Sequence, residues 1–253
     1  MKNSLLENII NISMFGSRVR GDEDERSDCD VVVVVKDGSG TVPEQSLQDF
    51  LLPLIGSHAS ISWYGLRKMV KMFADGDLFA WHLYLESLPL AGFPHLSKSV
   101  GRPAGYTRAY RDIAELEEIL VEVEWHLRRW PANAIYEAGI LYVCARNIAM
   151  SASWHLSTPS FGRYSPYHLP SFQFPLPPRT YDIAMSCRMA SQRGSPPPKE
   201  VDASWVLAVH ADLVPWSAQI KTEVKNVIGR HSQLKKQPIP DQDRVRAQDP
   251  QPR

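Results

Sequence analysis

The chain has 253 residues, of which 43% are hydrophobic and 22% are charged, and its 28 basic residues balance 28 acidic ones. This composition predicts a soluble globular protein, and its neutrality disfavours bulk electrostatic binding of nucleic acid. No apolar run approaches the ~20 residues of a membrane-spanning helix, no signal-peptide pattern begins the chain, and the 3 cysteines are widely spaced, so we expect a cytoplasmic protein without a disulfide framework or zinc site.

Near its start the chain combines a short predicted strand, residues 10–15, with a turn rich in glycine, serine and arginine. Glycine lets backbone N–H groups approach a phosphate closely, a serine hydroxyl adds a donor, and guanidinium groups suit phosphate oxygens. The turn therefore predicts a phosphate-binding site made of Gly16, Ser17, Arg18 and Arg20.

Two aspartates open the next predicted strand. An acidic run, residues 22–25, predicts a solvated loop, after which Asp28 and Asp30 precede the consecutive valines 31–35. Because strand side chains alternate between faces, both aspartates point to the same side, and a strand apolar on both faces belongs inside a covered sheet. Adjacent carboxylates repel each other unless a cation lies between them, and Mg²⁺ accepts one or two carboxylates together with phosphate oxygens and water. We therefore expect Asp28 and Asp30 to bind Mg²⁺, as a pair of ions.

The Gly-Ser turn followed by Asp-x-Asp on the next strand resembles the signature of the nucleotidyltransferase domain of the DNA polymerase β superfamily. The resemblance covers about the first 90 residues. It implies that Gly16 and Ser17 hold a nucleoside triphosphate (NTP) as co-substrate, while Asp28 and Asp30 bind the metal and are catalytic. It further implies that a nucleoside monophosphate passes to an acceptor hydroxyl on a small molecule, a protein or RNA.

The family usually has a third acidic residue on a following strand. Here a predicted helix, 45–55, leads to a predicted strand, 59–64. Ser60 and Ser62 would face the site, or Ala59 and Ile61 if the register slips by one residue, and none of these is acidic. Either another residue supplies the third carboxylate, or the domain binds nucleotide without catalysis. In the family this carboxylate is a metal ligand or the general base for the acceptor hydroxyl. The candidates for it are Glu86, which we predict to be catalytic, Asp77 and Glu137.

Residues 65–90 are predicted to be helical, with a break at 75–77 and Asp77 as the N-cap of a second helix, 78–86. His82 lies in that helix among aromatic residues, a pattern more typical of a packed histidine than of a site residue. Proline and glycine concentrate in 88–107 and predict a domain boundary.

We expect an α+β protein, in which a small mixed-sheet nucleotidyltransferase domain, 1–95, precedes an all-helical bundle domain, 106–228, and a disordered tail, 229–253. Apolar residues at helical spacing predict the helices of the bundle, which are 106–130, 133–156, 180–192 and 204–227. Residues 157–179 are rich in proline and predict an ordered loop between the second and third of these helices.

The helical half resembles both the acceptor-binding domain of antibiotic adenylyltransferases and the HEPN domain of toxin–antitoxin and defence systems. Arg146 and Asn147 begin like the HEPN ribonuclease signature, but His155 follows nine residues after Arg146, which is too far. Glu137, Arg146 and Asn147 either pair inside the bundle or face a cleft. Three hypotheses follow: a nucleotidyltransferase, a catalytically impaired module that binds nucleotide or a partner, and a HEPN-like ribonuclease. A protein partner or a second copy would bind through the helical domain.

Overall fold

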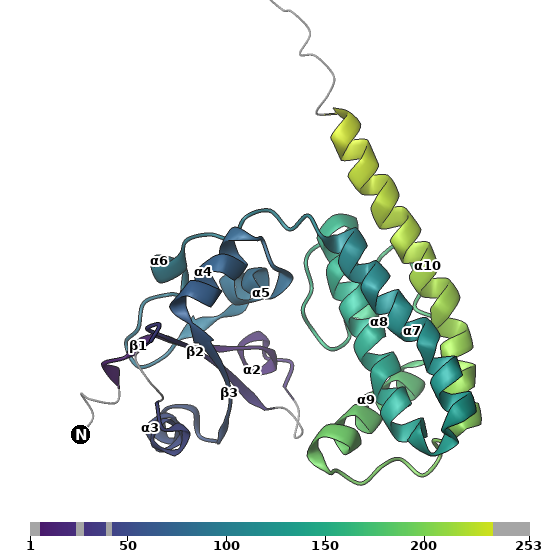
Figure 1. Cartoon of the computed structure of the whole chain (residues 1–253), viewed down its shortest axis with the longest axis horizontal. Helices are drawn as coiled ribbons and strands as arrows, with labels where there is room; N and C mark the ends of the chain where they lie inside the picture. Colours follow the sequence, from purple (N-terminus) through teal and green to yellow (C-terminus); the bar gives the residue numbers. More distant parts are fainter. Residues whose placement is uncertain (1–5, 24–27, 39–41, 235–253) are drawn as a thin grey trace, which may run out of the picture.

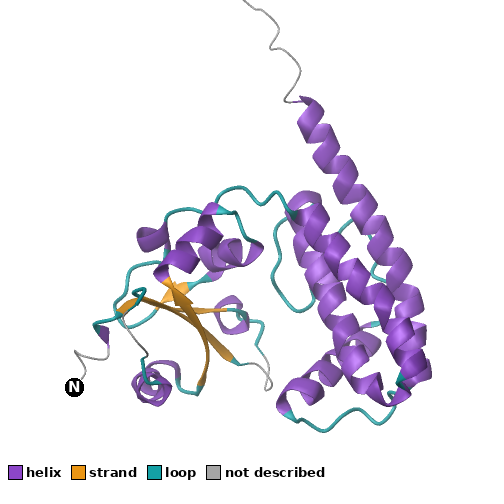
Figure 2. Cartoon of the chain, viewed as in Figure 1, coloured by secondary structure: helices purple, strands orange, loops and turns teal. Residues whose placement is uncertain are grey.

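A computed structural model describes residues 6–23, 28–38 and 42–234 of the chain. A small sheet with its own helices forms the first part, and a bundle of long helices lies beside it (Figure 1). Figure 2 shows that all strands belong to the first part. The expected order, a mixed sheet and then a helical bundle, is confirmed.

The sheet has four strands in the order β3-β2-β1-β4. β1 (Ile9–Phe15) pairs antiparallel with both β2 (Cys29–Val35) and the short β4 (Leu88–Pro89), whereas β2 pairs parallel with β3 (Ala59–Gly65). β2 therefore lies inside the sheet, as its uninterrupted valines predicted. β4 was not predicted from the sequence, because two residues carry no periodicity.

The two faces of β2 are buried against different helices. Val32 and Val34 pack with residues of α4 (Leu66–Ala74) and α5 (Leu78–Glu86), while Val31 and Val33 pack with α3 (Glu44–Ile55). All four valines are fully buried. The alternation also assigns Asp30 to the α5 side of the sheet, because it lies two residues before Val32.

The helical part consists of α7 (Ala109–Arg129), α8 (Ala134–Leu156), α9 (Pro178–Arg193) and α10 (Ala203–Leu234), with short 3₁₀ turns at Pro131–Asn133 and Ser165–His168. α8 packs against each of the other three long helices. α10 extends past the rest of the bundle (Figure 1) and includes the first six residues of the predicted tail, 229–234. The remainder of that tail lies outside the described residues.

Two aromatic contacts join the parts. Trp81 of α5 lies 4.6 Å, between ring centroids, from Trp154 of α8. His82 stacks on Phe161, which follows α8, at a centroid distance of 4.6 Å and an angle of 7°.

Leu96, just before α6 (Ser97–Val100), still belongs to the core beneath the sheet. In the part of the chain that the structure describes, no helix is both long and apolar enough to cross a membrane.

Candidate active site

A cleft with a volume of about 470 Å³ opens between the sheet part and the helical part. One wall comes from β1, α2 (Ser17–Arg20), the start of β2, and α5; the other comes from α8, α9 and the loop between them. The predicted site residues Gly16, Ser17, Asp28 and Asp30 all line this cleft, as does Arg20. The turn and the aspartates are thus brought together from separate strands.

Gly16 stands directly against the carboxylate of Asp30. Its φ of +83° is a left-handed value that favours glycine, and a Cβ at this position would lie 2.6 Å from Asp30 Oδ2. Ser17, which follows, is buried at the start of α2. The structure therefore requires glycine at position 16 for two reasons, the backbone conformation and the close approach of the Asp30 carboxylate.

The two aspartates differ in their surroundings. In the sheet, Asp30 lies opposite Phe15 of β1 and opposite Ser60 of β3. Burial and the negative charge of Asp28 raise the pKa of Asp30. Asp28 forms an ion pair with Arg193 from the end of α9. A cation between the two carboxylates would relieve their repulsion, and two carboxylates completed by phosphate oxygens and water form a donor set that suits Mg²⁺. Asp28 and Asp30 fit such an ion.

The two arginines of the turn point in different directions. Arg18 donates to the backbone carbonyl of Ile55, at the end of α3, with an N···O distance of 3.1 Å, and does not line the cleft. Residues two apart on a helix differ by about 200° in direction, so Arg18 and Arg20 of the short helix α2 cannot both face the cleft. The expectation that Arg18 contacts the nucleotide is not supported by its position.

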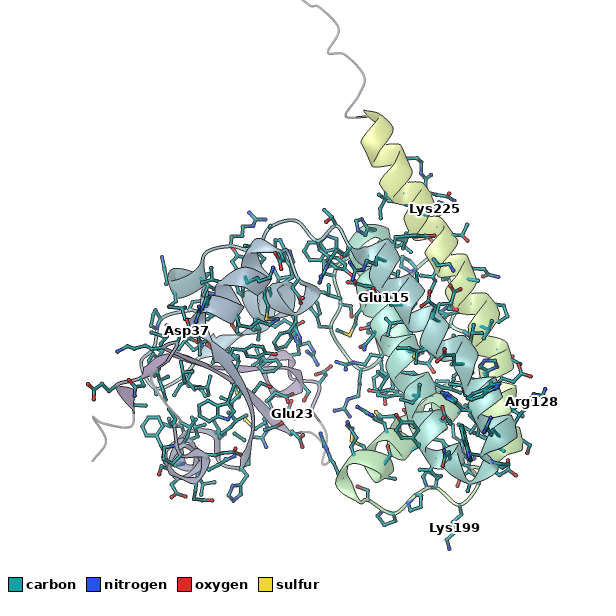
Figure 3. All side chains as sticks on the ribbon, viewed as in Figure 1. Glu23, Asp37, Glu115, Arg128, Lys199 and Lys225 are labelled. Atoms are coloured by element: carbon teal, nitrogen blue, oxygen red, sulfur yellow. The ribbon has the colours of Figure 1, made fainter. Side chains whose placement is uncertain are left out.

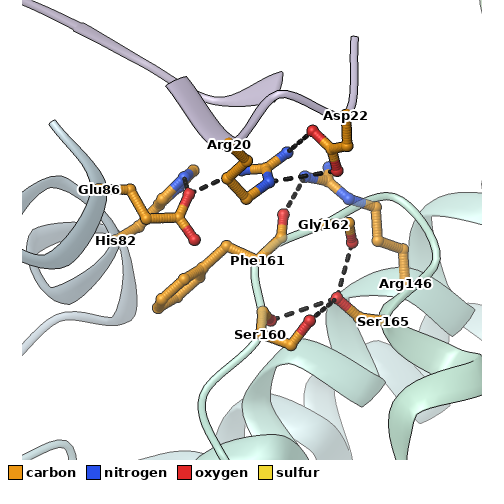
Figure 4. Close-up of polar contacts among 9 residues, drawn as sticks. All are labelled: Arg20, Asp22, His82, Glu86, Arg146, Ser160, Phe161, Gly162 and Ser165. Atoms are coloured by element: carbon orange, nitrogen blue, oxygen red, sulfur yellow. Dashed lines mark hydrogen bonds and ion pairs between the residues drawn. The ribbon is translucent and has the colours of Figure 1, made fainter. Parts of the chain in front are cut away.

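Glu86 holds cleft residues in place and does not itself line the cleft. Its Oε2 accepts from Arg20 at 2.7 Å and lies 3.0 Å from His82 Nε2, while Arg20 also bonds Asp22 (Figure 4). Burial raises the pKa of Glu86, but the bonds from His82 and Arg20 outweigh it, so the pKa is lowered. A carboxylate with a lowered pKa is a weak base, so its position suits an orienting role better than the catalytic role expected for it.

The other candidates for a third carboxylate lie away from the aspartate pair. Asp77 caps α5 by accepting from the Phe79 N–H, as predicted, and it pairs with Arg108. Glu137 pairs with His126 inside the bundle. Asp28 and Asp30 are the carboxylates among the described residues that line the cleft. Nor does any group of three or more His, Cys, Asp or Glu side chains within 6–23, 28–38 and 42–234 form a metal site.

The register of the sheet shows which residues of β3 occupy the expected place of the third acid. β2 and β3 run parallel with Asp30 opposite Ser60 and Val32 opposite Ser62, so the serines share the face of Asp30, as the sequence predicted. Ser60 is exposed and carries no charge. The acidic residues 24 and 25 of the loop before β2 lie outside the described part of the chain.

The helical wall of the cleft is rich in arginine. Arg146 of α8, Arg163 of the following loop, and Arg188 and Arg193 of α9 all line it. Of these, only Arg146 was weighed as a cleft residue from the sequence. A signal for the others was present, since Arg188 and Gln192, like Met189 and Arg193, are four apart and share one face of α9. His82 also lines the cleft, so it is both packed, as its sequence context favours, and part of the site surface.

A comparison with protein families supports the resemblance. Residues 2–72 match the family model described as a nucleotidyltransferase domain. A search of curated proteins found no match to the chain. Residues 2–72 are therefore a nucleotidyltransferase domain of the DNA polymerase β superfamily, and a helical region follows.

Proposed function

We propose that the chain is a Mg²⁺-dependent nucleotidyltransferase, which moves a nucleoside monophosphate from an NTP to an acceptor hydroxyl. In this proposal Gly16, Ser17 and Arg20 bind the triphosphate, and Asp28 and Asp30 hold the metal. Glu86 orients Arg20. The acceptor enters from the helical side of the cleft.

One observation carries the proposal. Gly16 lies so close to Asp30 that a Cβ would meet its carboxylate at 2.6 Å, and this closeness supports a turn that binds phosphate beside a carboxylate that binds the metal. The family match spans both elements.

The chemistry expected here is positioning and charge neutralisation. Mg²⁺ held by Asp28 and Asp30 would stabilise the charge that develops on the phosphate oxygens. Arg20 is already fixed between Glu86 and Asp22, so it offers donors to an anion without having to reorganise. The close contact between Gly16 and Asp30 keeps the reacting phosphate beside the carboxylates.

We further propose that the domain boundary lies between Val100 and Ala109, where neither helix nor strand is formed. This keeps the two predicted domains, 1–95 and 106–228, and adds α6 to the first. A cytoplasmic location and a protein partner on the helical domain stay predictions.

The test uses NTPs labelled at the α-phosphate and a panel of small-molecule, protein and RNA acceptors. Transfer should require Mg²⁺ and fall to background in Asp30→Asn. Asp37→Asn is a matched control, because Asp37 follows the opposite end of β2 (Figure 3), where its carboxylate accepts from the Arg67 N–H and pairs with the Arg67 guanidinium at the start of α4. No transfer from any of the four NTPs across the panel, with nucleotide binding intact, would refute the activity.

That negative outcome would favour the second candidate, a nucleotide-binding or partner-binding module. The observation behind it is the lack of a third carboxylate among the described cleft residues. The ribonuclease hypothesis loses support, because Arg146 lines the cleft whereas His155 lies against Tyr106. Nine residues amount to about two and a half helical turns, which puts the two side chains on opposite sides of α8.

A further inference from the structure

We propose that the helical wall of the cleft is a second phosphate-binding surface, in which Arg146 and Arg188 bind a phosphate group of a ligand. The inference rests on the proposed function, because it assigns a ligand to the other wall of the same cleft. It extends the site from the nucleotidyltransferase domain to α8 and α9.

The charge of this wall is the first observation. Four arginines from α8, α9 and the connecting loop converge on it, and the described residues that line it include no carboxylate. Tyr142 lines the same cleft as Arg146, Arg163 and Arg188. Burial raises the pKa of its phenol and Asp182 adds to the rise, whereas the charges of the three arginines oppose it. Like charges gathered on one wall favour the binding of an anion.

Arg146 supplies the second observation. Its Nη2 donates to the backbone carbonyl of Phe161 at 3.1 Å (Figure 4), which fixes the direction of the side chain. Its Nε is buried and has no hydrogen-bond partner in the described structure. A buried guanidinium donor without an acceptor is costly, so Arg146 would gain from a phosphate oxygen that reaches this group.

Arg188 supplies the third observation. It is half-buried, and its guanidinium makes no hydrogen bond or ion pair with the described residues. Its backbone is held close to α8, since a Cβ on Gly139 would lie 3.0 Å from the Arg188 Cα. Arg193, in contrast, already pairs with Asp28. Arg146 and Arg188 are therefore the two cations that best fit an incoming ligand.

A guanidinium group offers a planar fork of donors that matches phosphate geometry. The phosphate has two possible sources in this cleft, the β- and γ-phosphates of the NTP or a phosphate on the acceptor. Both present the same chemistry to the wall. An acceptor that carries several positive charges would be repelled by the same arginines.

The experiment measures binding to the full chain by calorimetry at constant ionic strength. The variants are Arg188→Gln, Arg146→Gln and Arg188→Lys, which keeps the charge and loses the fork. Arg179→Gln is the matched control, because Arg179 lies on the same helix, is exposed and does not line the cleft. Arg128→Gln is a control on the outer face of the bundle, where Arg128 pairs with Glu124 (Figure 3).

The first titrations use inorganic tripolyphosphate, a non-hydrolysable NTP analogue and a nucleoside monophosphate. If the phosphates of the NTP bind this wall, Arg188→Gln and Arg146→Gln lower the affinity for tripolyphosphate and for the analogue roughly tenfold or more. The affinity for the monophosphate changes less, and Arg188→Lys falls in between.

The second titration adds pyrophosphate to protein saturated with the analogue. If the phosphate belongs to the acceptor, the analogue binds all variants alike, and pyrophosphate binding is lost in Arg188→Gln. The proposal is overturned if every affinity in both titrations matches that of Arg179→Gln.

Binding and transfer separate the two proposals. A wild-type chain that binds tripolyphosphate through Arg188 but transfers no nucleotide refutes the proposed activity and leaves the phosphate surface standing. A chain that transfers nucleotide, and in which Arg188→Gln has the wild-type KM for every substrate, refutes the phosphate surface alone.

Discussion

Replacement of Glu86 by glutamine tests the charge network behind the cleft. The Glu86 carboxylate, 17% exposed, accepts from Arg20, 20% exposed, and bonds His82, which is 8% exposed. Glu86→Gln preserves the shape and one acceptor oxygen but removes the charge. We therefore expect a destabilised protein in which Arg20 is held less firmly in the cleft.

The magnitude follows from the two bonds. A hydrogen bond to a charged group contributes about 1.5–3 kcal/mol, and a neutral one about 0.5–1.5 kcal/mol. The difference for two such bonds gives a loss of about 2 kcal/mol in the free energy of unfolding at pH 7. The matched exposed pair is Arg111 with Glu115, whose side chains are 70% and 58% exposed; Glu115 is labelled in Figure 3. Glu115→Gln should therefore leave the free energy of unfolding nearly unchanged.

The pH dependence gives a sharper test. Although burial raises the pKa of Glu86, the bonds from His82 and Arg20 lower it below its ordinary value of 4.5. A lowered pKa in the folded state means that the stabilisation is complete above pH 4.5 and is lost as the pH falls through the folded value. Urea unfolding of wild type and Glu86→Gln should give a difference in the free energy of unfolding that is constant from pH 7 to about pH 4.5 and then shrinks toward pH 3.5. A gap that is absent at pH 7, or that stays unchanged at pH 3.5, would refute the reasoning.

Three further variants test the cleft and its frame. Gly16→Ala should abolish nucleotide binding in a titration while circular dichroism stays native, because a Cβ would enter the Asp30 carboxylate; wild-type affinity would contradict the proposed site. Phe161→Ala removes the ring that stacks on His82 and should cost about 3–5 kcal/mol in urea unfolding; a cost below ~1 kcal/mol would contradict that contact. Gly139→Ala should cost about 1–3 kcal/mol, because its Cβ meets the Arg188 backbone, whereas Gly229→Ala, with open space around it, should be neutral or stabilising; equal effects would contradict the close packing of α8 on α9.

The elements that the sequence predicted well are those with strong local patterns. The valines of β2 predict a buried strand because both faces are apolar, and the structure buries Val31 to Val34 completely. Asp77 was predicted as an N-cap from its position before an apolar run, and its side chain accepts from the Phe79 N–H. Such features depend on neighbours in the chain, so a pattern is sufficient to find them.

The features that were missed depend on contacts between distant segments. Arg18 donates to the backbone carbonyl of Ile55, 37 residues away, and no local pattern shows such a contact. Glu86 was expected to supply the third carboxylate as a metal ligand or general base, a role that stays a prediction, whereas its bond to Arg20, 66 residues away, was not foreseen. The arginine wall exists because α9 packs beside α8 and faces the sheet part, and that arrangement is set by tertiary packing.

The charge balance of the chain shows why a sum over the sequence is a poor guide to ligands. The 28 basic and 28 acidic residues cancel, yet five arginines and two aspartates line the cleft. Acidic residues of the bundle, such as Glu115, Glu117 and Glu124 of α7, pair elsewhere with Arg111, Lys221 and Arg128. A ligand responds to the charges that converge on its site, within about one Debye length. A chain with no net charge can therefore offer a basic cleft. The excess of guanidinium groups over carboxylates in this cleft favours the binding of phosphate groups at both walls.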